Sequence, residues 1–394
     1  MTSHDIHNAI VHCKQPINVH WDAFVHHSRG DIQQTSVWTA VDGDPARQVS
    51  RFYLMEGGDI VAGGQVVTRR MPVVGRFGFI LQGPCFKEHS FDYYDWFVAE
   101  AMKVAAKEGL RYLAVVPDYK VEGLVSLLEK RGFRRKSVHL PPNPTVKSTL
   151  ILDLRQSLEV LMQQVKKKRR KCILKGLACP VTYSIGGRDD LETFYTLLLA
   201  TCKRRNTKPI LRSSDILYRL WDRLVHKDAM VLHLAHVDGR PVGASIGLVN
   251  GGTYKNWLWG WTGEYSNYCI SETLDWKTIE WAKAHGCCCY DFLHLDPVSA
   301  KALEADEEVP DLIRNRTHFG STFYKMQFGG EVVHYPDIYY YFPRKRDYWL
   351  FHVLGHTLLN LCVVKKLALM FHPYRRGGLL IPLVSWSGLE LLVV

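Results

Sequence analysis

The sequence lacks the cysteine spacings that mark a disulfide framework or a zinc site. Its ten cysteines include no CxxC pair, and Cys287, Cys288 and Cys289 stand side by side in what reads as a strand after Gly286. Disulfide-rich secreted domains and zinc modules both depend on cysteines paired at fixed separations. We therefore expect no disulfide framework, no metal and no cofactor, and a reducing compartment.

The beginning of the chain also lacks a basic stretch followed by an apolar core, so no signal peptide is expected. Acidic residues are the minority charge: 50 Lys+Arg against 39 Asp+Glu leave a net charge of +11. This balance points toward a polyanionic partner such as a nucleic acid, a phosphorylated ligand or an anionic membrane face, and does not choose among them. With 394 residues, 47% of them hydrophobic, the chain has room for two or three globular domains, which excludes a disordered tail protein.

Residues 1–146 are predicted to form one mixed unit of strands and helices. The Gly57-Gly58 turn joins two strand-like runs into a hairpin, and a buried strand at 113–116 ends at Pro117. Apolar spacing predicts helices over 93–108 and 121–131. Three prolines within 141–144 make this segment the candidate linker.

Residues 147–335 repeat that order of elements, and residues 336–394 form a C-terminal extension. Strands are expected at 150–154, 230–235, 242–249, 254–261 and 290–292; helices are expected from Ser157 through the basic run 166–171, over 190–206 and over 271–284. The element order predicts a duplicated α+β fold with mixed sheets flanked by helices. No sequence repeat is strong enough to show the duplication directly.

The stretch from His318 to Gly330 carries the clearest chemical signal. Tyr324-Lys325 lies just before a Phe328-Gly329-Gly330 turn, in a mostly apolar and aromatic run. A partly desolvated ammonium held there would stabilise an oxyanion far better than one in water. The plainer reading is a lysine that keeps its charged end in solvent.

With these residues the chain resembles the Fem family, the aminoacyl-tRNA-dependent transferases that extend peptidoglycan peptide bridges, and most of all its short FemX-like members. The resemblance covers roughly residues 21–335. In the first unit it rests on Trp21, Phe24, Gln34, Trp38, Gly63-Gly64-Gln65, Arg69-Arg70, Pro72 and Ile80 to Pro84. In the second it rests on Leu152 to Leu154, Arg170 to Gly176, Thr201, Arg204, Asp238 to Val242, Leu274, Trp276, Tyr290 to Phe292, and Tyr324-Lys325 with Phe328 to Gly330.

The resemblance implies two GNAT-like domains, of the acyl-CoA N-acyltransferase fold, in tandem. The first would hold the acceptor and the second would receive the aminoacyl end of a tRNA. The acceptor amine would attack the ester carbonyl directly, with Lys325 stabilising the oxyanion and the departing ribose and Tyr324 shaping the pocket. The resemblance also assigns phosphate contact to Arg204, or to the adjacent Arg205.

Two further residues are candidates for substrate binding. Trp38 belongs to the motif of the first domain, on the acceptor side. Asp291 either orients a backbone turn or binds the incoming ammonium. Two departures from the family pattern fall in the acceptor half: Asp42 stands where the family carries a lysine, and Val116 where FemX-like members can carry an acidic residue. A small amine from an antibiotic pathway is therefore an alternative to a peptidoglycan precursor as acceptor.

Several other signals each have two readings. The run of Lys166, Lys167, Lys168, Arg169, Arg170 and Lys171 contacts the tRNA backbone or is a solvated helix face. The alternating Trp257, Trp259 and Trp261 face one side of a strand, where they stack the terminal adenine or pack in a core.

Two patterns are weak. Gly243 to Gly247 fits G-x-S-x-G, but more strand follows Ser245 where a nucleophile elbow needs a helix. His294, Asp296 and Cys289 lack a second paired set of metal ligands.

Two rival functions are also compatible with the sequence. An acyl-CoA N-acyltransferase usually carries an Arg/Gln-x-x-Gly-x-Gly/Ala loop for the pyrophosphate, and no such loop is evident. A non-catalytic RNA-binding protein on a decayed transferase would tolerate replacement of Lys325. We expect a cytoplasmic protein, and the apolar run 349–364 either packs on the first domain or lies at the inner face of the membrane.

Overall fold

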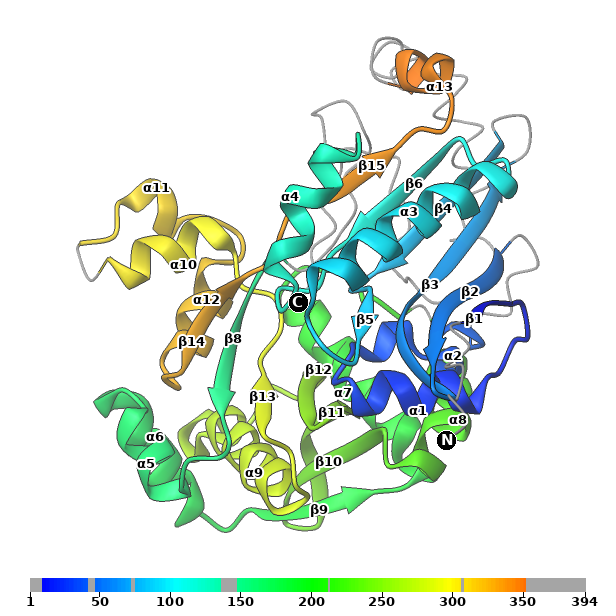
Figure 1. Cartoon of the computed structure of the whole chain (residues 1–394). Coiled ribbons are helices and arrows are strands. Elements are labelled where there is room, and N and C mark those ends of the chain that lie inside the picture. Colours follow the sequence, from blue (N-terminus) through cyan, green and yellow to red (C-terminus); the bar gives the residue numbers. More distant parts are fainter. Residues whose placement is uncertain are drawn as a thin grey trace, which may run out of the picture. The chain divides into compact units, whose positions relative to one another are not determined.

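The computed structural model describes residues 9–41, 47–71, 75–135, 147–211, 213–305 and 308–351, which form two compact units (Figure 1). The first unit combines the residues up to 135 with residues 335–351, and the second spans 147–334. The proline-rich segment 141–144, Asp42 and all residues after 351 lie outside the described residues.

The first unit is built on a mixed sheet with the strand order β1-β2-β3-β4-β6-β15-β7, in which β5 also pairs with β3. The strands are β1 (Ala9–Cys13), β2 (Arg47–Glu56), β3 (Asp59–Met71), β4 (Gly75–Leu81), β5 (Cys85–Phe86), β6 (Tyr112–Val116), β7 (Arg134–Arg135) and β15 (Tyr339–Tyr341). β4 and β6 are parallel, and the other described neighbours are antiparallel. The predicted hairpin is confirmed by β2 and β3.

Helices cover this sheet, and α3 (Phe91–Lys107) crosses one of its faces in Figure 1. The hydroxyl of Ser90 accepts the Tyr93 amide and so caps the first turn of α3. The fully buried Phe97 of α3 stacks on Phe52, with ring centroids 5.5 Å apart. The remaining helices are α1 (Val19–His27), η1 (Ile32–Gln34), α2 (Ser36–Thr39), α4 (Glu122–Lys130) and α13 (Lys345–Trp349).

The described part of the C-terminal extension belongs to the first unit. β15 pairs with both β6 and β7, and the Arg111 guanidinium lies 2.7 Å from the buried Asp347 carboxylate. Among the described residues, no helix has the length and apolar character needed to cross a membrane. The predicted role of 349–364 falls largely on residues outside the description.

The second unit repeats the plan with the strand order β14-β8-β13-β12-β11-β10-β9. Its strands are β8 (Ser148–Asp153), β9 (Thr182–Gly186), β10 (Met230–Val237), β11 (Arg240–Asn250), β12 (Thr253–Trp261), β13 (Cys289–Asp291) and β14 (Glu331–His334). Here too one pair of neighbours is parallel: β12 and β13, joined by α9 (Ile270–Ala284) as β4 and β6 are joined by α3. The matching topologies confirm the predicted duplication of an α+β fold.

The helices of the second unit include one correction to the sequence prediction. They are α5 (Leu158–Gln164), α6 (Lys167–Leu177), η2 (Arg188–Asp190), α7 (Leu191–Arg204), α8 (Asp215–Leu224), η3 (Val225–Lys227), η4 (Ser266–Tyr268), α9, α10 (Pro297–Glu304), α11 (Asp311–Arg314) and α12 (Phe319–Met326). The helix predicted to run from Ser157 through the basic cluster is two helices. Ser157 caps α5, but Val165 is extended and the Lys166 amide donates to the Gln327 carbonyl at 2.9 Å, which fixes a break before α6.

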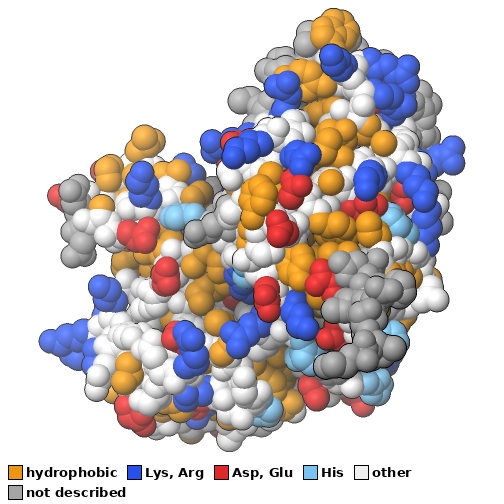
Figure 2. Space-filling model, viewed as in Figure 1, with side chains coloured by type: hydrophobic (Ala, Val, Ile, Leu, Met, Phe, Trp, Pro, Cys, Tyr) orange, Lys and Arg blue, Asp and Glu red, His pale blue; other side chains and the backbone are white. Residues whose placement is uncertain are grey.

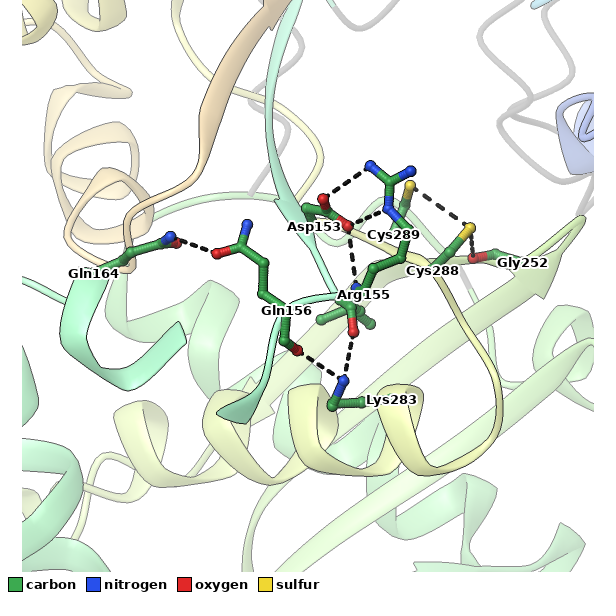
Figure 3. A network of polar contacts seen from close by, with 9 residues as sticks. Asp153, Arg155, Gln156, Gln164, Gly252, Lys283, Cys288 and Cys289 are labelled. Atoms are coloured by element: carbon green, nitrogen blue, oxygen red, sulfur yellow. Dashed lines mark hydrogen bonds and ion pairs between the residues drawn. The ribbon is translucent and has the colours of Figure 1, made fainter. Parts of the chain in front are cut away.

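Of the three adjacent cysteines, Cys288 and Cys289 belong to a polar network (Figure 3). Only Cys289 falls within β13, so the expectation of a strand across all three is wrong for Cys287 and Cys288. The Cys288 thiol donates to the Gly252 carbonyl at 3.3 Å, and the described cysteines are free thiols. Beside them, the Lys283 ammonium of α9 donates to the carbonyls of Leu154 and Gln156, both at 2.7 Å, which ties α9 to the end of β8.

Candidate functional site

Tyr324 and Lys325 stand in the last turn of α12, whose end is held by a pair of glycines. Gly329 and Gly330 have φ values of 80° and 88°, which side chains disfavour. A Cβ on Gly330 would lie 2.5 Å from the Ile151 carbonyl oxygen of β8. The glycine turn therefore lets the chain run close against β8, and it fixes where α12 presents Tyr324 and Lys325.

The Lys325 ammonium is held by backbone carbonyls. Nζ lies 2.6 Å from the Leu293 oxygen and 3.2 Å from the His294 oxygen, in a turn where both residues have positive φ. An ammonium has three N–H donors, so one remains for a ligand. Burial lowers the pKa of Lys325 to about 8, an effect that Asp275 and Asp291 oppose and Arg205 reinforces. At neutral pH this is a fixed, mostly protonated cation in partly desolvated surroundings.

Asp291 supports the turn that holds Lys325. Its Oδ1 accepts the Leu293 amide at 2.8 Å and the Thr149 hydroxyl, and its Oδ2 lies 3.8 Å from the Lys255 ammonium. The side chain is buried and does not line the cavity described below. Of the two roles predicted for Asp291, these contacts favour the orientation of a backbone turn.

A chain of hydrogen bonds runs from Tyr324 into the sheet. The Tyr324 hydroxyl donates to Asp275 Oδ2 at 2.8 Å, the Asn256 amide donates to Asp275 Oδ1 at 2.9 Å, and the Ser245 hydroxyl donates to Asn256 at 2.8 Å. Burial raises the pKa of Asp275 to about 6, although both hydrogen bonds lower it. Ser245 is buried within β11 and points to Asn256, so the G-x-S-x-G match is no nucleophile elbow.

A β-bulge in β12 shapes the wall of the site. The register against β11 shifts so that Ile246 faces Leu258 while the next residue, Gly247, faces Asn256, which makes Trp257 the extra residue of β12. Such a bulge changes the direction in which neighbouring side chains point. Asn256, Trp257 and Trp259 all line the cavity, as does Trp261 farther along the strand.

These elements enclose a cavity of about 470 Å³ within the second unit. Its lining includes basic side chains at Arg204, Arg205, Lys208 and Lys325, carboxylates at Glu272 and Asp275, and the aromatic rings of Tyr324, Phe292 and the three tryptophans. The Arg204 guanidinium lies 4.6 Å from the Trp261 ring centroid and donates to the Trp261 carbonyl at 2.8 Å. The Arg205 amide donates to the Thr201 carbonyl at 3.0 Å, but its guanidinium makes no hydrogen bond or ion pair to another described residue. Four of the predicted site residues, Lys325, Tyr324, Arg204 and Arg205, thus surround one cavity.

The basic run divides into two groups. Lys166, Lys167, Lys168 and Lys171 are exposed, and basic side chains project where α5 and α6 lie in Figure 1 (Figure 2). Arg169 instead pairs with Glu272, and its guanidinium lies 4.2 Å from the Tyr324 ring centroid. Arg170 donates to the Gln163 and Val165 carbonyls, at 3.2 Å each. Arg169 therefore connects α6 to the site, a contact that the sequence did not reveal.

The remaining predicted residues lie elsewhere. Trp38 is buried on α2 of the first unit, and Val116 is buried at the end of β6. Asp296 caps α10 through Ser299 and forms a two-pronged ion pair with Arg316. Among the described residues, no group of three or more His, Cys, Asp or Glu side chains is arranged to hold a metal ion.

Comparisons with known proteins identify the architecture. A family model described as an acetyltransferase (GNAT) domain matches residues 161–305, in the second unit, and no curated protein sequence matches the chain. The crystal structure of FemX matches with a TM-score of 0.72, covering 85% of this chain and 97% of FemX at 15% sequence identity. The chain has a FemX-like GNAT fold. The resemblance to the Fem family and the predicted tandem fold are confirmed at the level of the fold.

Two other solved structures share this FemX-like fold more distantly. L-PGS from Bacillus licheniformis gives a TM-score of 0.52 at 14% identity, covering 88% of this chain and 97% of that one. The C-terminal domain of a putative lysylphosphatidylglycerol synthetase from Agrobacterium fabrum gives 0.51 at 13% identity, covering 86% and 95%. The chain thus combines a GNAT fold with a cavity that Lys325 lines.

Proposed function

We propose that the protein transfers an aminoacyl group from aminoacyl-tRNA to the amine of an acceptor and so forms an amide bond. The observation that carries the proposal is the Lys325 ammonium, which two carbonyls hold at a cavity that Arg204 and Arg205 also line. A fixed cation with one free donor suits a tetrahedral oxyanion, and arginines suit the phosphates of a nucleic acid end.

The reaction needs no covalent enzyme intermediate. The acceptor nitrogen attacks the ester carbonyl, a C–N bond forms and the carbonyl oxygen becomes an oxyanion beside Lys325. The C–O bond to the ribose then breaks, the ribose oxygen gains a proton and the nitrogen loses one. Catalysis on this scheme comes from positioning and from preorganised charge.

The donor end of the cavity has features that an RNA terminus would use. Arg204, Arg205 and Lys208 supply positive charge, while Trp257, Trp259 and Trp261 offer aromatic rings to an unpaired base. The exposed lysines 166, 167, 168 and 171 would contact the tRNA backbone farther out. Use of aminoacyl-tRNA would place the protein in the cytoplasm.

The acceptor is proposed to be an amine of a peptidoglycan precursor or of a related small molecule, including an antibiotic intermediate. Trp38 of the first unit is the candidate acceptor contact. Asp42 and Val116 depart from the family pattern in the same unit, and this favours a small amine over a standard muropeptide. Contact of residues after 351 with a membrane would suit a lipid-linked acceptor.

An acyl-CoA-dependent N-acyltransferase is the second candidate, because the matching family model is that of a GNAT acetyltransferase domain. The two candidates differ in the donor. The first test is transfer of radiolabelled amino acid from a pool of charged tRNAs to candidate amines, with and without ribonuclease, and with acetyl-CoA as the rival donor.

Variants sharpen that test. Lys325→Ala is expected to lower transfer at least about hundredfold, the usual loss on removing one oxyanion donor. Lys301→Ala, on the exposed face of α10, is the matched control and is expected to keep the rate. Transfer that survives ribonuclease and requires the acyl-CoA would reject the tRNA donor. Full activity of Lys325→Ala would reject the role of the lysine.

A further inference from the structure

Asp275 is a carboxylate whose charge lacks a direct partner. It is buried at 3% exposure, lines the cavity from α9, and accepts hydrogen bonds from two neutral groups, the Tyr324 hydroxyl and the Asn256 amide. Within the residues that the structure describes, it forms no ion pair. A carboxylate that is buried without a cation is costly, and folded proteins seldom keep one without a use.

The other two carboxylates near the cavity are already matched by cations. Glu272, one turn earlier on α9, pairs with Arg169, and Asp291 lies 3.8 Å from the Lys255 ammonium. Lys325 donates to two carbonyl oxygens and not to Asp275. Asp275 is therefore the cavity carboxylate that is left to bind a cation from outside the protein.

We infer that Asp275 is a specificity-determining residue that binds the α-ammonium group of the aminoacyl donor, an inference that rests on the proposed function. In an aminoacyl ester the α-ammonium is one carbon from the carbonyl. Asp275 and Lys325 both line the cavity, so it offers an anion for the ammonium and a cation for the carbonyl oxygen. An acyl group without the ammonium would leave the carboxylate buried and unpaired, which selects against acyl-CoA donors.

The decisive experiment compares one aminoacyl-tRNA with its N-acetylated form, which has the same ester and no ammonium. Wild-type enzyme is expected to prefer the free amine by at least about thirtyfold in kcat/KM, because removing one partner of a buried charge pair is strongly unfavourable. Asp275→Asn keeps the size of the side chain but not its charge, and its oxygen can still accept from Asn256 while its NH2 group donates to the Tyr324 hydroxyl, so the preference should fall to within about threefold. Glu280→Gln, also on α9, is the control and should retain the full preference.

The results separate the role of Asp275 from the proposed use of aminoacyl-tRNA. If wild-type enzyme uses both donors equally, the role of Asp275 is overturned while aminoacyl-tRNA dependence stands. If no charged tRNA supports transfer at all, the proposed function fails and this inference fails with it. Should Asp275→Asn fail to fold, as judged by circular dichroism, the wild-type ratio and a donor with an α-hydroxyl in place of the ammonium still test the inference. Equal use of that donor would overturn it.

Discussion

The Tyr324 hydroxyl donates a 2.8 Å hydrogen bond to the buried Asp275 carboxylate, and Lys325 follows Tyr324 directly on α12. Tyr324 and Lys325, neighbours in the last turn of α12, therefore connect the Asp275 carboxylate of α9 to the Lys325 ammonium at the cavity. Burial and the nearby Asp275 raise the pKa of Tyr324 well above its usual value, so the phenol stays a donor throughout the working pH range.

Replacing Tyr324 by phenylalanine tests this link. Tyr324→Phe keeps the ring that packs on Phe328, but leaves Asp275 with one donor fewer and should raise the pKa of its carboxyl further above about 6. The groups facing Asp275 are then Asn256, Lys325 and Glu272. We expect the acid limb of the pH profile of kcat/KM to move to higher pH, and the free energy of unfolding to fall by about 1–3 kcal/mol. An unshifted acid limb in a folded variant would separate Tyr324 from the ionisation of Asp275.

The alkaline limb should belong to Lys325. Its pKa is about 8, lowered mainly by burial, and the charged groups facing it are Asp275, Asp291 and Arg205. The protonated form stabilises the oxyanion, so the rate should fall as pH rises through about 8, by about tenfold for each further pH unit. Lys325→Arg keeps its proton over this range and should flatten the alkaline limb, at a lower rate. An alkaline limb unchanged in the arginine variant would assign that ionisation to another group.

Asp291 should act through the turn that it holds. Asp291→Ala frees the Leu293 amide and loosens the two carbonyls that bind Lys325, so we expect kcat to fall by about ten- to hundredfold with KM for the donor little changed. Asp291→Asn retains an oxygen for the Leu293 amide and should restore most of kcat. Single-turnover and steady-state kinetics of both variants make the test. Equal loss in the two variants would show that charge on Asp291, and not the turn, matters.

The sequence predicted the fold better than the site. Alternation and turn residues located β2, β3 and β12, and Ser157 marked the start of a helix, because these signals are local. They did not reveal the break before α6. That break depends on a bond from the Lys166 amide to Gln327, a residue far along the chain.

Local sequence signals likewise revealed only part of the candidate site. Lys325 and Arg204 were found through family motifs, whereas Asp275 sits in an ordinary helical pattern between Leu274 and Trp276. Its partner Asn256 lies next to a bulge in β12, where the direction of the side chains changes, and a bulge set by pairing with β11 leaves no mark in the local alternation. The one sequence signal for Asp275 was an acidic residue on the buried face of the helix predicted over 271–284.

Neighbouring residues of the basic run should have different effects. Lys168 is exposed, so Lys168→Met should raise KM for charged tRNA and reduce the slope of log KM against log salt by about one, as for a single lost phosphate contact. Arg169 is half-buried, packs on the Tyr324 ring and pairs with Glu272. Arg169→Met would remove the cation that pairs with Glu272 and packs on the Tyr324 ring, so kcat should fall. The slope of log KM against log salt should stay the same. Kinetics at several salt concentrations distinguish the two. If Arg169→Met changes only the salt slope, the guanidinium acts on tRNA and its contact with Tyr324 is incidental.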